Sequence, residues 1–122
     1  MRGAIKSLKA LSDETSIRVI NLVLQRECCV CEVTHALDIS QSKASRHLSA
    51  LYDAGFLKLR KDGLWSLYSV DEEGLQDYQK DLVNSIRKIL KGYKPVESDN
   101  ARLRTVKRRV LNNADAVCVS EP

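Results

Sequence analysis

The chain has 122 residues, of which 43% are hydrophobic, and a formal net charge of +4. This length and composition fit one small domain with a modest core, which gains stability by burying further surface against a partner subunit. The sequence has no run of about 18 apolar residues, so we expect no membrane span. The N-terminal residues lead into no long apolar segment of a secretory signal. We therefore expect a cytoplasmic protein.

Positive charge is concentrated in two parts of the chain. Residues 40–65 carry five basic residues against two acidic ones, and residues 91–122 carry seven against four. Such focused charge is typical of a surface that contacts phosphates, whereas a generally basic protein would spread it evenly.

Apolar residues recur at helical spacing through the first half of the chain. They predict a short helix over residues 4–11 and a second helix that Ser12 or Asp13 caps. A third helix is expected from Cys29 or Val30 to about residue 38. A fourth follows, capped by Ser40, and it buries Ala44, Leu48, Leu51 and Tyr52 before Gly55 ends it in the left-handed conformation.

The outer face of the fourth helix is rich in serine and has no acidic residue before Asp53. An ordinary solvated face would favour Glu and Lys, whereas short polar side chains with an arginine suit base edges and phosphates. Two short helices with a tight turn, the second carrying this face, predict a helix-turn-helix. The residues of this helix expected to contact DNA are Gln41, Ser42, Lys43, Ser45, Arg46, His47 and Ser49.

After Gly55 the pattern changes to the alternation of strands. The pair Asp62-Gly63 predicts a two-residue type I′ hairpin turn that pairs Arg60 with Trp65. One face of this hairpin is expected to be in the core, namely Leu57, Leu59, Leu64, Tyr68 and Val70. The hairpin would form a wing beside the helix-turn-helix, and the side chains expected near phosphates are Lys58, Arg60 and Lys61.

A long helix is expected from Asp71, with an apolar stripe that has little core left to cover. We expect this stripe and the first helix to form a dimer contact, with packing on the same subunit as the alternative. The residues assigned to dimerisation are Ile5, Leu8, Leu75, Tyr78, Leu82, Ile86 and Ile89. Residues 1–92 would thus form the domain, and residues 93–122 a basic tail, partly helical over residues 101–114.

Three cysteines, Cys28, Cys29 and Cys31, lie within six residues, and Cys118 follows near the end. Nearly adjacent cysteines are poor cross-links, and in the cytosol such spacing is more typical of metal-binding or redox sites. Thiolates select soft ions, so three sulfurs suit trivalent arsenic or antimony, while the chain has only two histidines to offer a zinc site. Cys29 and Cys31 are expected as ligands with Cys28 as the third. Cys118 is the alternative if the tail folds back, and binding by two sulfurs is another.

Several motifs in this order resemble the ArsR/SmtB winged-helix metalloregulators. The motifs that carry this resemblance are residues 11–15 (LSDET), 27–32 (ECCVCE), 40–48 (SQSKASRHL) and 55–57 (GFL). The resemblance implies an α+β, mainly α, winged helix-turn-helix fold with N- and C-terminal dimerisation helices. It also implies a homodimeric repressor that binds a palindromic DNA operator as apoprotein and releases it when a toxic metal or metalloid binds.

Cys29-Val30-Cys31 followed by an acid is similar to the arsenic-responsive branch of that family, which implies arsenite or antimonite as the inducer. Cys29 and Cys31 match the first two ligands of the branch, but the third cysteine position is Thr34 here, and Ser16 stands where arginine is common. A repressor that senses oxidants or persulfides through the same thiols is the alternative function. An enzyme is not expected, because no substrate-binding motif accompanies the thiols.

Overall fold

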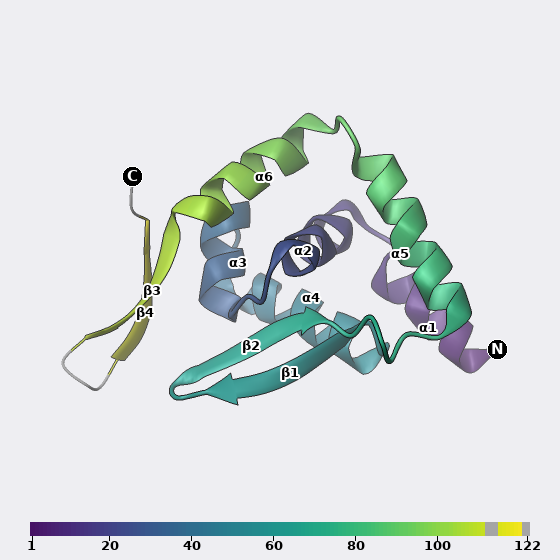
Figure 1. The fold of residues 1–122 in the computed structure, drawn as a ribbon, viewed down its shortest axis with the longest axis horizontal. Helices are drawn as coiled ribbons and strands as arrows, with labels where there is room; N and C mark the ends of the chain where they lie inside the picture. Colours follow the sequence, from purple (N-terminus) through teal and green to yellow (C-terminus); the bar gives the residue numbers. More distant parts are fainter. Residues whose placement is uncertain (112–114, 121–122) are drawn as a thin grey trace.

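The computed structural model describes residues 1–111 and 115–120, which form six helices and two antiparallel hairpins (Figure 1). The elements are α1 (Arg2–Ala10), α2 (Glu14–Gln25), α3 (Val30–Leu37), α4 (Gln41–Asp53), β1 (Leu57–Asp62), β2 (Trp65–Val70), α5 (Asp77–Leu90), α6 (Lys94–Thr105), β3 (Val106–Leu111) and β4 (Asp115–Ser120). Among the described residues, no helix combines the length and apolarity needed to cross a membrane. The predicted winged helix-turn-helix, mainly helical with a small wing, is confirmed.

The local capping signals position the helices as predicted. The Asp13 carboxylate accepts a hydrogen bond from the Ser16 amide at 2.7 Å and begins α2, and Ser40 Oγ accepts from the Lys43 amide at 3.1 Å and begins α4. Gly55 follows α4 with φ +90°, a conformation that disfavours any side chain. The expectation that Tyr52 is buried was wrong, because the last turn of α4 leaves it 46% exposed.

The core lies between α2, α3, α4 and the base of the wing, with α2 at the centre of the fold (Figure 1). Its largest fully buried apolar side chains are Phe56, Ile20, Leu22, Leu48, Leu51, Val19 and Val33, while Leu67 is buried in a second cluster with Cys29, Val106 and Cys118. Because α3 packs against α4, any movement of α3 bears directly on the predicted DNA-reading helix.

The wing forms as expected, but its register differs from the prediction by two residues. Arg60 pairs with Leu67, and Asp62 with Trp65, so Gly63 is the first of the two loop residues, with φ +58°. A glycine at that position is the requirement of a type II′ turn, whereas the expected type I′ turn needs positive φ at both positions. The outer part of the hairpin extends beyond the core, and the prediction that Leu59 and Leu64 are buried was therefore wrong.

Helix α5 begins at Asp77 because residues 71–74 form a turn first, with the Gly74 amide donating to Asp71 O at 3.0 Å. Its buried apolar side chains, Ile86 among them, pack on the same chain, as does Leu75 just before the helix. An apolar face remains uncovered: Ile5 and Leu8 of α1 and Ile89 of α5 are exposed, the last by 66%.

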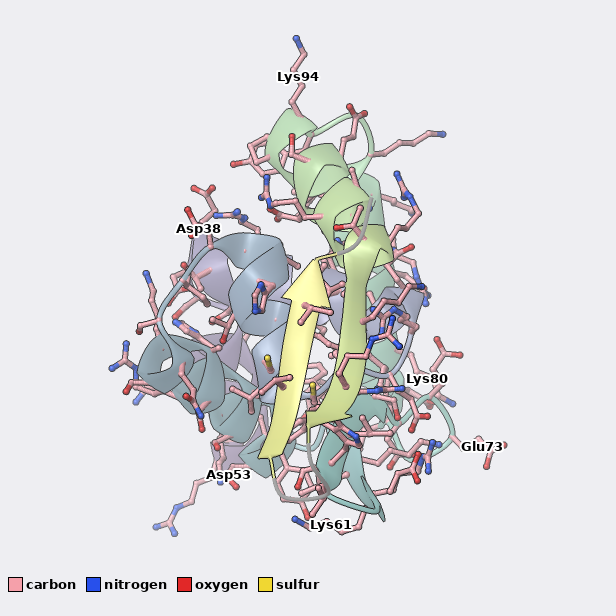
Figure 2. All side chains as sticks on the ribbon, turned by 90° about the vertical axis from the view of Figure 1, so that its left-hand side faces the viewer. Asp38, Asp53, Lys61, Glu73, Lys80 and Lys94 are labelled. Atoms are coloured by element: carbon pink, nitrogen blue, oxygen red, sulfur yellow. The ribbon has the colours of Figure 1, made fainter. Side chains whose placement is uncertain are left out.

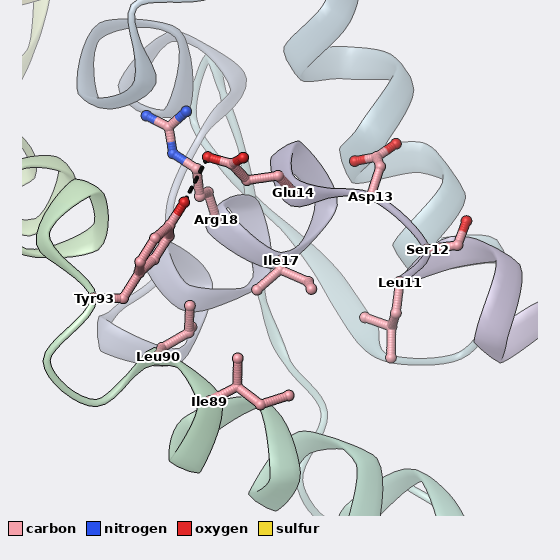
Figure 3. Close-up of a pocket in the computed structure, with 9 residues that line it drawn as sticks. All are labelled: Leu11, Ser12, Asp13, Glu14, Ile17, Arg18, Ile89, Leu90 and Tyr93. Atoms are coloured by element: carbon pink, nitrogen blue, oxygen red, sulfur yellow. Dashed lines mark hydrogen bonds between the residues drawn. The ribbon is translucent and has the colours of Figure 1, made fainter.

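A shallow groove lies next to that face, between the start of α2 and the end of α5 (Figure 3). Its volume is about 440 Å³, and its walls are mostly apolar, with Ile17, Ile89 and Leu90 among them. Tyr93 Oη donates to Glu14 Oε1 at 2.8 Å across one end.

The segment expected as a tail instead packs on the domain. Helix α6 contacts α2 and α3, and the β3–β4 hairpin lies over α3 (Figure 2). The helix is fixed by the buried Asp99 carboxylate, which receives two hydrogen bonds from Arg18 at 2.8 and 2.7 Å and one from Arg102 at 2.8 Å. Residue 118 is thereby brought back to the cysteine segment.

Candidate DNA interface and cysteine site

The outward face of α4 presents the polar side chains that the sequence indicates. Gln41, Ser42, Ser45, Arg46 and Ser49 are exposed, while their neighbours Ala44 and Leu48 hold the helix to the core. Lys43 is half-buried. Serine hydroxyls donate and accept, and arginine forms paired bonds to guanine or phosphate, so this face has the chemistry of a DNA-reading helix.

His47 lies apart from that face. Its Nδ1 lies 2.9 Å from Ser16 Oγ on α2, and burial lowers the pKa of its ring. The histidine is therefore neutral at neutral pH and brings no positive charge to a phosphate. Its position favours a role in holding α4 against α2.

The wing cations differ in their availability. Lys58 and Lys61 are exposed, and Lys61 Nζ reaches Ser66 Oγ at 2.5 Å. Arg60 instead forms a two-bond ion pair with Glu27, both at 2.7 Å, and this pairing raises the pKa of Arg60 and lowers that of Glu27. Arg60 is therefore linked to the cysteine segment before any DNA is bound.

Cys28 is turned toward the core. Its backbone pairs with β2 through reciprocal bonds, Cys28 N to Tyr68 O at 2.9 Å and Tyr68 N to Cys28 O at 2.8 Å. Its Sγ lies 3.4 Å from Arg26 O and is fully buried. Burial raises the pKa of this thiol to about 12, so Cys28 is a protonated packing residue in this conformation.

Cys29 and Cys118 form a buried sulfur pair. Their Sγ atoms are 3.7 Å apart, although 89 positions separate them in the chain. The hydrogen bond from Cys118 lowers the pKa of Cys29, and the pKa of Cys118 is raised because this thiol keeps the shared proton. Cys31 is half-buried and packs beside them.

Cys29 is the N-cap of α3 and has extended backbone angles, φ −87° and ψ 167°. Residues two apart within a helix do not face each other, but only Cys31 is inside α3, so a helical backbone does not keep the two sulfurs apart. In the described part of the chain, no group of three or more Cys, His, Asp or Glu side chains is already drawn together as a metal centre. The thiols of Cys29, Cys31 and Cys118 nevertheless are the type of donor that a thiophilic ion prefers, provided that the Cys31 side chain turns toward the other two.

Glu32 holds the start of α3 and is the residue that sequence reasoning missed. Its carboxylate accepts from the Cys29 amide at 2.9 Å, from Arg26 at 2.6 Å and from Arg108 of β3 at 3.1 Å. The side chain is only 2% exposed. Its place three residues after an N-cap signals a capping box, but nothing in the sequence indicates the arginine that arrives from residue 108.

Comparisons with known proteins agree with this geometry. The sequence model described as "Bacterial regulatory protein, arsR family" matches residues 13–64. The arsenic resistance transcriptional regulator ArsR1 of Pseudomonas putida KT2440 is 47% identical over 66 residues, which are 53% of this chain and 52% of that protein. The arsenical resistance operon repressor of Bacillus subtilis 168 is 35% identical over 74 residues, 60% of this chain and 70% of the relative.

Among solved structures, the homodimeric winged helix-turn-helix domain of Mb0332 from Mycobacterium bovis, titled a possible ArsR-family transcriptional regulator, is similar with a TM-score of 0.62. It is 20% identical, and the match covers 75% of this chain and 82% of that one, so it bears on the fold alone. The match with the P. putida regulator spans about half the length of that relative. The B. subtilis repressor, by contrast, is matched over more than two thirds of its length at an identity above 30%. The chain therefore belongs to the ArsR family of bacterial regulatory proteins.

Proposed function

We propose that the protein is a cytoplasmic homodimeric repressor that binds palindromic operator DNA and releases it when arsenite or antimonite binds its cysteines. The observation that carries this proposal is the position of the thiols at the first turn of α3, the helix that packs against α4 on the side away from the exposed polar face. The names of the arsenic-resistance relatives support the choice of inducer.

The DNA contact would use both parts of the winged domain. The exposed side chains of α4 would lie in the major groove, and Lys58, Arg60 and Lys61 would contact the phosphates beside it. Arg60 would have to exchange its bond with Glu27 for a phosphate, so DNA binding and the state of the cysteine segment are coupled at this residue.

A dimer would place two such faces on a two-fold operator, as half-site recognition requires. The contact would use the uncovered apolar side chains of α1 and α5. Ile5, Leu8 and Ile89 are exposed, and Tyr78 and Leu82 are partly so. Leu75 and Ile86 are buried within the subunit and would add little.

Inducer binding would act through the N-cap of α3. Drawing the Cys29 and Cys31 sulfurs onto one ion disturbs the capping contact between Cys29 and Glu32, and the strain passes to α4 through its packing on α3. A coupling of about 1–3 kcal/mol is typical of such systems and changes DNA affinity roughly 5- to 150-fold.

The test is a gel mobility shift of the reduced protein on DNA from upstream of its own gene, with and without sodium arsenite. We expect binding without arsenite and release at saturating arsenite. Cys29→Ser and Cys31→Ser proteins should bind the DNA and fail to release it, whereas Ser42→Ala with Arg46→Ala should fail to bind. Wild-type protein that stays bound at saturating arsenite contradicts the proposal.

The spacing of 3.7 Å between Cys29 Sγ and Cys118 Sγ supports a second candidate, a thiol-based redox sensor. In this case hydrogen peroxide would take two electrons from the two thiols, forming a disulfide and two molecules of water. The same mobility shift separates the candidates, since release by peroxide without release by arsenite would favour the redox sensor.

A further inference from the structure

We propose that Cys118 supplies the third sulfur of the metalloid site, so that Cys29, Cys31 and Cys118 hold the ion and the β3–β4 hairpin is part of the sensor. This inference rests on the proposed function and specifies its site. It assigns a role to a segment outside residues 13–64, the part that matches the family model.

The first argument is the position of the sulfurs. Cys118 Sγ lies 3.7 Å from Cys29 Sγ, and Cys31 lies against the same small cluster with Val106 and Leu67. The hairpin thus brings a thiol to the N-cap of α3 from the opposite side of the site. Three donors on two separate elements are able to surround an ion, which adjacent residues of one extended segment are poorly placed to do.

The second argument is the exclusion of Cys28. Its sulfur points toward Leu22 O at 3.8 Å and Arg26 O at 3.4 Å, away from the Cys29–Cys118 pair. Turning it outward would break the two backbone bonds that join Cys28 to Tyr68 on β2. Each buried backbone group left without a partner costs about 1–3 kcal/mol.

The third argument is a charged anchor that positions Cys118. Arg108 is the cross-strand partner of Cys118, and side chains of paired residues lie on the same face of a hairpin. Arg108 donates to the buried Glu32 carboxylate at 3.1 Å, while Cys118 contacts Cys29. Both members of the pair therefore dock on the first turn of α3, which holds the third thiol in place before the ion arrives.

The chemistry is balanced without an oxidant. Trivalent arsenous acid exchanges its three hydroxyl groups for three thiolate sulfurs, and each thiol proton leaves with a hydroxyl as water. Arsenic stays trivalent, and the pyramidal product needs three sulfurs on one side, as soft-ligand preference favours. Cys31, which is half-buried beside the pair, has to turn its sulfur toward Cys29 and Cys118.

The test uses the reduced full-length protein titrated with sodium arsenite. Arsenic X-ray absorption counts the sulfurs around the ion, and near-ultraviolet As–S absorbance gives the affinity. We expect three sulfurs for wild type and for Cys28→Ser. For Cys118→Ser we expect two sulfurs and one oxygen around the arsenic. The affinity for arsenite should fall by more than about tenfold, because loss of even an indirect contact typically costs about that much at a metal site.

Cys28→Ser is the matched control, because it removes a thiol from the same segment. Far-ultraviolet circular dichroism and thermal melting of both variants establish that they fold. Three sulfurs retained in Cys118→Ser, or a sulfur lost in Cys28→Ser, overturns the inference while leaving an arsenite-released repressor intact. Wild-type protein that binds no arsenite removes the proposed function together with this inference.

Discussion

Glu32 joins three parts of the molecule at a single buried side chain. Its carboxylate caps the amide of Cys29, pairs with Arg26 after α2, and pairs with Arg108 on β3. The two arginines are about one third exposed, at 36% and 31%, while Glu32 is 2% exposed. A buried carboxylate is tolerated only when such partners satisfy it, so Glu32 couples the docking of the hairpin to the start of α3.

We predict that Glu32→Ala lowers the free energy of unfolding by about 2–3 kcal/mol, because it removes charge-assisted hydrogen bonds and leaves buried donors unpaired. Glu32→Gln should cost less, since the amide oxygen still accepts from Cys29. Urea denaturation measures both. Glu97→Ala, at an exposed acid of α6, is the control and should change stability by less than about 0.5 kcal/mol. Equal losses for Glu32→Ala and Glu97→Ala would contradict the assignment.

The cysteines illustrate what a sequence reveals at this scale. The pattern of Cys29, Val30 and Cys31 before an acid indicates a thiol site, and the structure brings both cysteines to it. It does not reveal which way Cys28 turns, because that depends on backbone pairing with Tyr68, forty residues later in the chain. The contact with Cys118 depends on a residue still farther along the chain, 89 positions after Cys29. The spacing of the cysteines can be read from the sequence, whereas the identity of the third sulfur depends on contacts in the tertiary structure.

Among the elements, α2 to α4 were predictable and α6 with its hairpin was not. The first three carry periodic apolar faces and capping residues such as Asp13 and Ser40, which are local signals. Helix α6 buries few apolar side chains and is fixed mainly by polar contacts with distant partners. Asp99 binds Arg18, and Asn100 Oδ1 accepts from Asn21 at 2.8 Å. No periodicity in residues 93–122 could indicate these partners.

We predict that Asp99→Ala detaches α6, at a cost of about 3 kcal/mol in stability, because a buried ion pair that loses one partner leaves the other uncompensated. Hydrogen exchange should accelerate across residues 94–105 and remain slow in α4. Asp99→Asn should give an intermediate effect, since it keeps hydrogen bonding without charge. Unchanged exchange in α6 of Asp99→Ala would show that apolar contacts suffice to hold it.

At the scale of the whole molecule, α1 and α5 present an apolar face that nothing in the single chain covers. Leu8 is 51% exposed and Ile89 66% exposed, although helical periodicity places them with the apolar stripes. A contiguous apolar surface of this kind normally marks an interface. The sequence predicts the apolar stripe of α5. Only the structure distinguishes the side chains that are buried within the subunit, such as Ile86, from those that remain exposed.

We predict that Leu8→Glu with Ile89→Glu makes the protein monomeric at micromolar concentration, as measured by light scattering after size exclusion. Operator binding should fall with it, because each half-site would then be held alone. Leu64→Gln, which changes an equally exposed leucine at the tip of the wing, should stay dimeric. A doubly charged variant that remains a dimer would move the interface elsewhere.

The pairing of Cys28 with Tyr68 joins the cysteine segment to the edge of the wing by a single β-bridge. Side chains two apart on an extended strand share a face, which places Glu27 and Cys29 on one side of this pivot and Cys28 on the other. If an ion displaces Cys29 while the two Cys28–Tyr68 backbone bonds stay intact, the cysteine segment has to rotate about those bonds. Glu27 then rotates with it. Glu27 holds Arg60 through its side-chain ion pair, so a movement of the sulfurs reaches the wing through this bridge and this ion pair, independently of the path through α3 and α4.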